Sequence, residues 1–204
     1  MKSAMILDYG IGNIGSLGTM LDSLGYTHSV IDDPESVKTC PMLILPGVGS
    51  SKTAMRELRA RKLIEPLKER YASGKAIVGI CLGAQVLFEY LDESREAGLG
   101  FLPGKVKAIT GSPRFNTGWC HLEWKQLCRT GVSTGIYQSD TFFFNHQYRF
   151  PLTKGMKTVS VQGNADIPAI YFHKNLCGVQ FHPEKSQMQG RTLLRNILRK
   201  YYGL

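Results

Sequence analysis

The sequence lacks paired cysteines, metal-binding spacings and long hydrophobic runs. Its five cysteines form no Cys-x-x-Cys pair and no zinc-ligand spacing with the five histidines. Such an odd, unpaired set predicts a reducing compartment, and we expect no metal or other cofactor. No segment approaches the roughly 20 apolar residues of a membrane helix, and the apolar run in residues 1–8 is too short for a signal peptide. We therefore expect a cytoplasmic chain that is complete from residue 1 and makes no membrane contact.

Acidic residues are the scarcer charged group, with 16 Asp and Glu against 25 Lys and Arg, which gives a net charge of +9. This excess is compatible with nucleic acid, an anionic substrate or an acidic protein partner. The basic residues are scattered, mostly along segments with helical apolar spacing, and the chain carries no recognised nucleic-acid-binding motif. We therefore interpret them as solvated helix faces and expect no nucleic-acid partner.

The first half of the chain alternates short apolar runs with longer amphipathic ones. Strands are predicted at 4–7, 27–31, 42–45 and 76–80, and helical spacing at 17–24, at 55–71 and from Val86 through Tyr90. Strands that alternate with crossover helices indicate a mostly parallel sheet covered on both faces. Because no linker interrupts the pattern, we expect one α/β domain over residues 1–204.

The second half has a different pattern. Between Gly104 and Gln180, short runs rich in Val, Ile, Tyr, Phe and Trp are broken by Gly, Pro and Asn. These runs predict antiparallel strands added to the same sheet or lying beside it. A final helix is predicted because four apolar residues near the end share one helical face: Leu193, Leu194, Ile197 and Leu198.

A Gly-x-Cys-x-Gly motif lies where the fourth predicted strand gives way to helical spacing. It reads Gly79-Ile80-Cys81-Leu82-Gly83. In the equivalent serine motif, a strained strand-to-helix turn lifts the nucleophile clear of the sheet, and a helix N-terminus favours a thiolate. Side chains at Gly79 and Gly83 would collide with the neighbouring strand and helix. On this motif alone, a small buried cysteine between two packing glycines is an equally good interpretation.

A second motif ends an apolar strand with a histidine, in the run Gln180-Phe181-His182-Pro183-Glu184. Strand-like alternation across Pro183 would place Glu184 on the same side as His182, where a carboxylate can orient an imidazole. A single histidine at a strand end is more often structural. A base held by a third group is, however, what a cysteine nucleophile requires, so Cys81, His182 and Glu184 together form a candidate triad.

A glycine-rich turn, Pro46-Gly47-Val48-Gly49, directly follows a predicted buried strand. Glycines allow a backbone to direct N–H groups at a developing oxyanion, and the N–H of Leu82 is the usual second donor. An ordinary turn is the alternative. The combination with the two preceding motifs favours an oxyanion-binding segment.

These three motifs resemble those of the class I glutamine amidotransferases, and the match includes Gly79-Ile80-Cys81-Leu82-Gly83-Ala84-Gln85 and Gln180-Phe181-His182-Pro183-Glu184-Lys185. The resemblance extends over nearly the whole chain. Within the family, the chain most resembles the amidotransferase subunits of imidazole glycerol phosphate synthases. This resemblance implies a flavodoxin-like α/β fold. The additional segments that carry it are Asp8-Tyr9-Gly10-Ile11-Gly12-Asn13, Asp32-Asp33-Pro34-Glu35, residues 98–106, Gly118-Trp119 and Lys185-Ser186.

The resemblance implies a glutaminase reaction. Cys81 would attack the side-chain amide of glutamine, His182 would move the proton to the departing ammonia, and Glu184 would hold the imidazole. Water would then hydrolyse the thioester to glutamate. By position, the oxyanion contacts would come from Gly49 and Leu82, and the glutamine-binding residues would be Gly47, Gln85, His146, Gln147 and Tyr148.

The resemblance also implies a partner. In the family, the ammonia passes inside a heterodimer to a (β/α)₈ cyclase subunit, which forms imidazole glycerol phosphate and an aminoimidazole carboxamide ribotide in histidine biosynthesis. Asn13 and Lys185 correspond to positions at that interface.

The chain departs from the family pattern near the pocket and the implied partner surface. Cys120 replaces a common Asn after Gly118-Trp119, the run Asn145-His146-Gln147-Tyr148 replaces Val-His-Ser-Tyr, Phe143 replaces a frequent Tyr, and Ala84 replaces a common Met. An alternative function is therefore a paralogous subunit that supplies ammonia to a sugar-modifying enzyme of surface polysaccharide synthesis.

Proteins of two other classes would share part of these features. A thiol protease or related hydrolase would also need Cys81 and His182, but Gln85, Glu184 and the glycine-rich turn fit a glutaminase better. A non-enzymatic binding protein would not need all three triad residues.

Overall fold

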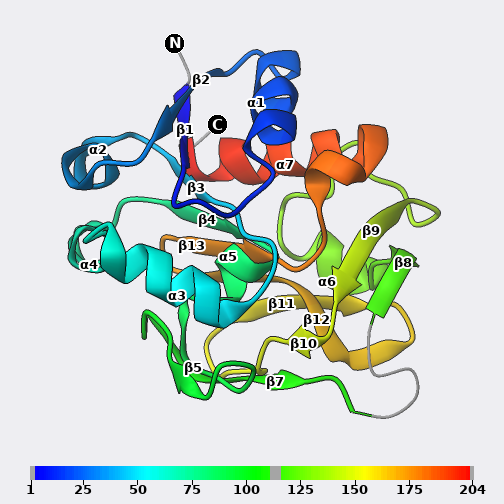
Figure 1. The fold of residues 1–204 in the computed structure, drawn as a ribbon. Helices are drawn as coiled ribbons and strands as arrows, with labels where there is room; N and C mark the ends of the chain where they lie inside the picture. The colour runs from blue at the N-terminus through cyan, green and yellow to red at the C-terminus, as the bar shows by residue number, and fades with distance from the viewer. Residues whose placement is uncertain (1–2, 111–115, 203–204) are drawn as a thin grey trace.

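The computed structural model describes residues 3–110 and 116–202, and a seven-stranded sheet runs through its centre (Figure 1). The strand order is β11-β12-β13-β4-β3-β1-β2. The five strands from β13 to β2 are parallel, whereas β11 and β12 are added at one edge through antiparallel pairs, β12 with β13 and β11 with β12. The mostly parallel sheet with added antiparallel strands is therefore confirmed. The bounds are β1 Ser3–Leu7, β2 Thr27–Ile31, β3 Leu43–Leu45, β4 Ile77–Ile80, β11 Lys157–Val161, β12 Asn164–His173 and β13 Leu176–Val179.

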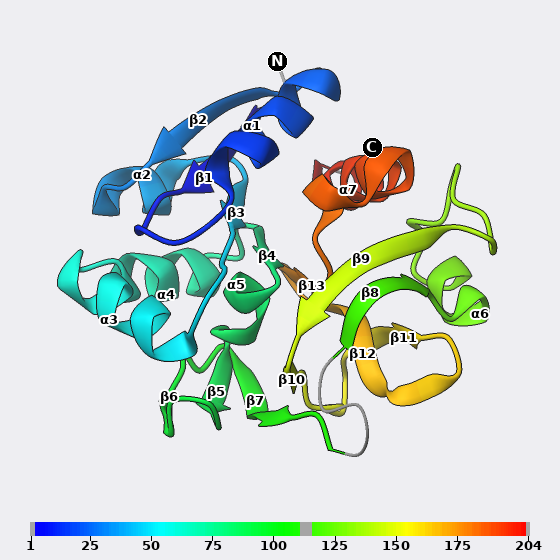
Figure 2. The ribbon, with the colours of Figure 1, turned by 45° about the vertical axis from the view of Figure 1, so that its right-hand side comes forward.

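Hydrophobic clusters cover both faces of this sheet. Neighbouring strand residues point to opposite faces, so Ile6 and Val78 join one cluster while Leu7 and Ile77 join the other. α1 and α7 pack on the first face, and the predicted apolar face of α7 is fully buried there. α2, α3 and α4 pack on the second (Figure 2). The helix bounds are α1 Ile14–Ser23, α2 Pro34–Thr39, α3 Ser51–Ala60, α4 Ile64–Ala72 and α7 Gln187–Tyr202.

Two smaller sheets lie beside the central one (Figure 2). One has the order β10-β7-β5-β6, and the other pairs β8 with β9. Contrary to what its sequence pattern predicted, the second half of the chain does not form antiparallel strand pairs alone. β7 pairs in parallel with β5, and β13 pairs in parallel with β4. The remaining bounds are β5 Phe88–Leu91, β6 Glu96–Ala97, β7 Leu102–Ala108, β8 Asn116–His121, α6 Trp124–Cys128, β9 Thr141–His146, β10 Tyr148–Arg149 and the 3₁₀ turn η1 Pro183–Lys185.

The helix that we predicted through Val86, Leu87 and Tyr90 is wrong. The helix after Cys81, α5, covers only Leu82–Gln85, and the chain then turns into β5. Val86, Leu87 and Phe88 are all buried, so this apolar run has no exposed face from which a period could be read. The pairing of β5 with β6 and β7 determines its conformation.

The helical spacing predicted over 55–71 belongs to two helices. α3 ends at Ala60 and α4 begins at Ile64. Between them Lys62 adopts φ +56°, a left-handed conformation that ends a helix. The apolar period continues across this break because both helices pack against the same cluster.

Candidate active site

Cys81 lies at the carboxyl end of β4 in a strained backbone conformation, with φ +52° and ψ −113°. Its N–H donates to the Val179 carbonyl at 2.7 Å. A Cβ on Gly79 would lie 2.6 Å from the Ala84 Cα in α5, and one on Gly83 would overlap the Leu45 carbonyl oxygen in β3. Both glycines therefore permit the close packing that holds Cys81 in its turn, as the sequence predicted. A strained residue at a strand-to-helix junction is typical of a nucleophile elbow.

His182 follows β13 and is held by hydrogen bonds at its backbone and its ring. Its N–H donates to the Phe143 carbonyl at 2.9 Å, and its Nδ1 lies 2.9 Å from the Oε1 of Glu184. Because the carboxylate accepts this bond, Nδ1 carries a hydrogen and Nε2 is left for Cys81. Glu184 lies in η1, so the strand-like alternation expected across Pro183 is wrong. The tight 3₁₀ turn nevertheless brings the carboxylate back to the imidazole, and only 1% of its side chain is exposed.

The charge on His182 depends on two opposing effects. Burial lowers its pKa, whereas hydrogen bonds with Cys81 and Glu184 and the negative charges of both groups raise it, with a net result of about 9. A raised pKa favours the protonated ring, an imidazolium beside the sulfur of Cys81. A proton is thus already present on the group that would deliver it to a leaving ammonia.

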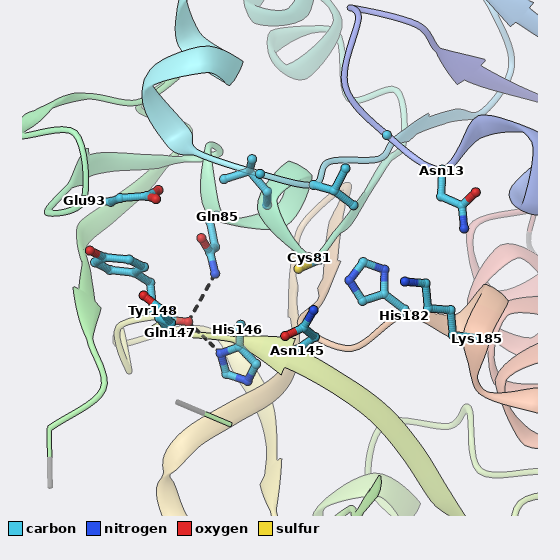
Figure 3. Close-up of a pocket in the computed structure, with 14 residues that line it drawn as sticks. Asn13, Cys81, Gln85, Glu93, Asn145, His146, Gln147, Tyr148, His182 and Lys185 are labelled. Atoms are coloured by element: carbon cyan, nitrogen blue, oxygen red, sulfur yellow. Dashed lines mark hydrogen bonds between the residues drawn. The ribbon is translucent and has the colours of Figure 1, made fainter. Parts of the chain in front are cut away.

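A pocket of about 720 Å³ opens beside Cys81 and His182 (Figure 3). Its lining comes from the β1–α1 turn, the segments after β3 and β5, the α5 turn, the end of β9 with the start of β10, and the segment from the end of β13 through η1. The lining residues are Gly12, Asn13, Val48, Gly49, Cys81, Leu82, Gln85, Glu93, Asn145, His146, Gln147, Tyr148, His182 and Lys185. The structure therefore brings together, around one cavity, most of the predicted oxyanion, glutamine-binding and interface residues.

Gly47 is the exception, since it is not one of the residues that line this pocket. A Cβ on Gly47 would lie 2.6 Å from the Gly83 nitrogen and 2.9 Å from the Tyr9 hydroxyl. The residue thus permits close packing of the glycine-rich turn on the α5 turn. Gly49, with φ +90°, is the glycine of this turn that reaches the pocket.

Tyr9 holds the start of the glycine-rich turn. Its hydroxyl donates to the Pro46 carbonyl at 2.6 Å. Burial raises the pKa of this phenol far above its usual value, and the negative charge of Cys81 raises it further, so Tyr9 remains a neutral donor. The sequence motif Asp8-Tyr9-Gly10 contained this residue, but nothing in it indicated contact with Pro46.

His146 is held neutral at the base of the pocket. Its Nδ1 donates to the Tyr148 carbonyl at 2.7 Å, and its Nε2 accepts from Asn116 Nδ2 at 3.2 Å. Burial lowers its pKa to about 4, since the effect of the Tyr148 carbonyl is smaller and the charge of His182 acts in the same direction as burial. Gln85 Nε2 also donates to the Tyr148 carbonyl, at 3.2 Å (Figure 3).

Three residues near the site were missed by the sequence analysis. Glu93 lines the pocket, and its Oε2 accepts from the Ser51 N–H at 2.7 Å, at the start of α3. No local pattern marks this residue, which follows β5 closely. Asn145 and Gln180 lie inside runs that we quoted, but neither type of side chain indicates chemistry by itself.

The pocket mouth carries both predicted interface residues. Asn13 and Lys185 lie on the His182 side of the cavity, in β1–α1 and η1 (Figure 3). Lys185 Nζ lies 5.8 Å from the centre of the Phe143 ring, which packs edge-on against Trp119. Trp119 is 46% exposed. A cation and an exposed aromatic surface therefore lie next to the pocket mouth.

Over residues 3–110 and 116–202, no group of three or more His, Cys, Asp and Glu side chains could hold a metal ion. Within the same ranges, none of the helices has the length and apolar character needed to cross a membrane.

Comparison with known proteins gives consistent matches over the whole chain. The model of the family "Glutamine amidotransferase class-I" matches residues 5–201. The "Imidazole glycerol phosphate synthase subunit HisH" of Microcystis aeruginosa is 34% identical over 100% of this chain and 98% of its own length. The HisH subunits of Acaryochloris marina and Moorella thermoacetica are each 37% identical, over 97% of this chain and 94% of theirs.

Solved structures show the same fold at lower identity. A crystal structure of a glutamine amidotransferase superposes with a TM-score of 0.75 and 20% identity, covering 98% of this chain and 99% of that one. A chain in the structure of PurLQS from Thermotoga maritima superposes with a TM-score of 0.73 and 19% identity, covering 98% of both chains. From the family match and the full-length relatives, this chain belongs to the class I glutamine amidotransferase family.

Proposed function

We propose that this chain hydrolyses glutamine to glutamate and ammonia, with Cys81, His182 and Glu184 as its catalytic triad. The observation that carries the proposal is the strained Cys81 at the end of β4, beside an imidazole that a buried carboxylate orients. A thiol, a base and an orienting acid in this order are the requirements of nucleophilic amide hydrolysis. The family match supports glutamine as the amide.

The reaction follows from the charges of the site. The Cys81 thiolate attacks the side-chain amide carbon of glutamine and forms a tetrahedral intermediate. N–H groups of Leu82 and the Gly49 segment stabilise its oxyanion, and His182 donates a proton to the amide nitrogen as the C–N bond breaks. Ammonia leaves a thioester on Cys81. His182, now neutral, takes a proton from water, whose oxygen attacks the thioester and releases glutamate and the thiolate.

The pocket lining suggests how glutamine is held. The Glu93 carboxylate provides a charge for the α-ammonium group, and the Ser51 N–H fixes one of its oxygens. Gln85, His146, Gln147 and Tyr148 line the same cavity, where neutral polar groups can bind the remainder of the amino acid. His146 is uncharged at neutral pH and therefore does not compete with the ammonium for Glu93.

We also propose that the chain works as the glutaminase subunit of an imidazole glycerol phosphate synthase, because its full-length relatives carry that name. Ammonia would pass to a cyclase subunit seated over the pocket mouth. Asn13 and Lys185 would contact this partner, beside the exposed Trp119. The net charge of +9 suits a partner with an acidic face.

The decisive experiment measures glutaminase activity of the purified chain, alone and with the histidine-pathway cyclase subunit of the same genome. Both measurements are made with and without the ribotide ligand of the cyclase. We expect low activity alone and strong stimulation in the complex, which Cys81→Ser removes. If glutamine is hydrolysed but the cyclase does not stimulate the reaction, the glutaminase assignment stands and a sugar-modifying enzyme becomes the favoured partner. Absence of hydrolysis under all conditions would overturn the proposal.

A further inference from the structure

Gln180 is a fully buried polar residue that no step of the proposed reaction uses. It follows β13, whose four residues are all buried, and it lies two residues before His182. Its backbone N–H donates to the Ala169 carbonyl at 2.8 Å. A buried amide is costly unless its polar atoms are hydrogen-bonded, so the partners of this side chain should explain its presence among apolar neighbours.

The amide is oriented by Gln85. The Nε2 of Gln85 donates to the Tyr148 carbonyl, which identifies this end of Gln85 as its NH₂ group. The same NH₂ donates to Gln180 Oε1 at 3.1 Å. Because Gln180 Oε1 accepts from Gln85, the NH₂ group of Gln180 must point the other way, toward Cys81.

The NH₂ group of Gln180 meets the sulfur of Cys81. The distance from Nε2 to Sγ is 3.7 Å, within the range of a hydrogen bond to sulfur. The imidazole of His182 lines the same pocket and interacts with this sulfur as well, since Cys81 is one of the groups that raise its pKa. An N–H donor stabilises a thiolate more than a thiol, since hydrogen bonds to charged groups are the stronger ones.

We propose that Gln180 is a positioning residue that stabilises the Cys81 thiolate and fixes its sulfur, and that Gln85 holds its amide in the required orientation. The proposal rests on the proposed function in that it takes Cys81 as the nucleophile. It adds a link between the glutamine pocket and the sulfur, because Gln85 lines the pocket and also contacts Gln180.

The test compares Gln180→Glu and Gln180→Met with the wild-type chain. The first keeps the shape and the acceptor for Gln85 but removes the N–H donors, and the second removes both polar atoms. The rate of Cys81 alkylation by iodoacetamide is followed by peptide mass spectrometry from pH 5 to pH 10. We expect the midpoint of the pH profile to rise by about one unit or more in both variants, because a hydrogen bond to a charged group typically shifts an equilibrium about tenfold.

Steady-state kinetics provide the second readout. We expect kcat for glutamine to fall about tenfold or more, with KM changed less than threefold, since the amide contacts the sulfur and not the outer pocket. Gln126→Glu and Gln126→Met are matched controls, because Gln126 in α6 uses its Oε1 to accept from the Ser160 N–H away from the pocket. Both controls should keep the wild-type alkylation midpoint.

An unchanged alkylation midpoint in folded Gln180 variants would overturn the proposal, and so would loss of folding in both, because the amide would then be a structural requirement only. Alkylation does not require glutamine. If the wild-type chain fails to hydrolyse glutamine but the midpoint still moves, the proposed function fails while the role of Gln180 stands.

Discussion

The Nδ1 of His182 lies 2.9 Å from the Oε1 of Glu184, and the side chains of both residues are at least 95% buried. A carboxylate so far removed from water has a strong effect on the imidazole that it contacts. It fixes the ring so that Nε2 faces Cys81, and it helps raise the pKa of His182 to about 9 despite burial. Orientation and charge of the candidate base thus depend on one contact.

Glu184→Gln tests this dependence. The amide oxygen can still accept from Nδ1, but the negative charge of the carboxylate is lost, so the pKa of His182 falls. We expect kcat for glutamine to fall about 100-fold, in the range of lost general acid–base catalysis, and the alkaline limb of the pH–kcat profile to move to lower pH. Glu35→Gln, on the exposed helix α2, is the control and should keep the wild-type profile. An unshifted alkaline limb in Glu184→Gln would contradict the assignment.

Cys81→Ser tests the nucleophile. The hydroxyl is nearly the same size, but it is a weak nucleophile at neutral pH, so glutaminase activity should fall below about one thousandth of the wild-type value. The melting temperature should stay close to that of the wild type. Cys128→Ser alters an exposed cysteine at the end of α6 and should be fully active. Retained glutamine turnover in Cys81→Ser, or equal losses in both variants, would refute the triad.

The three residues of the candidate triad could be selected from the sequence because their signals are local. Two glycines flank Cys81, and His182 and Glu184 are separated by a single residue. The structure confirms that the glycines permit close packing, but it reaches the His182–Glu184 contact through a 3₁₀ turn where we expected extended chain. The residue types were sufficient to indicate that His182 and Glu184 pair. They were not sufficient to indicate the backbone geometry that produces this pair.

Contacts between distant segments could not be predicted in this way. Gln180 and Cys81 are 99 residues apart, and they meet because β13 and β4 are neighbouring parallel strands. Glu93 reaches the pocket only because the chain after β5 lies beside the start of α3. The strand order of the sheet decides both contacts, and no pattern in either segment specifies that order.

Gly83→Ala should destabilise the fold. A Cβ there would overlap the Leu45 carbonyl oxygen, a backbone atom of the central sheet that cannot easily move. We expect a loss of about 2 kcal/mol or more in the free energy of unfolding, measured by urea denaturation. Gly15→Ala lies in α1 with open space around the new methyl group, so it should instead increase the free energy of unfolding, by at most about 1 kcal/mol. Equal effects of the two substitutions would show that the elbow is not tightly packed.

Lys185→Ala should weaken coupling to the cyclase subunit more than it affects the fold. The lysine is exposed at the pocket mouth and contacts the Phe143 ring, so its loss removes little buried surface. We expect stimulation of glutaminase by the cyclase to fall at least about fivefold, with the melting temperature within about 2 °C of wild type. Lys68→Ala, on the solvent side of α4, is the matched control and should keep full stimulation. A large drop in melting temperature for Lys185→Ala would mean that the residue is structural.

His146 should make the fold sensitive to mild acid. Its pKa is about 4 in the folded chain and about 6.5 when unfolded, so between these values the unfolded state binds a proton that the folded state does not. Stability is therefore lost as the pH falls from about 6.5 toward 4. Between pH 7 and pH 5, we expect the free energy of unfolding of the wild-type chain to fall by about 2 kcal/mol more than that of His146→Gln. Urea denaturation at both pH values measures this difference, and the contribution of His182 is largely common to both proteins. The exposed His121→Gln variant should behave like wild type, and an equal loss in His146→Gln would show that His146 is not buried as a neutral ring.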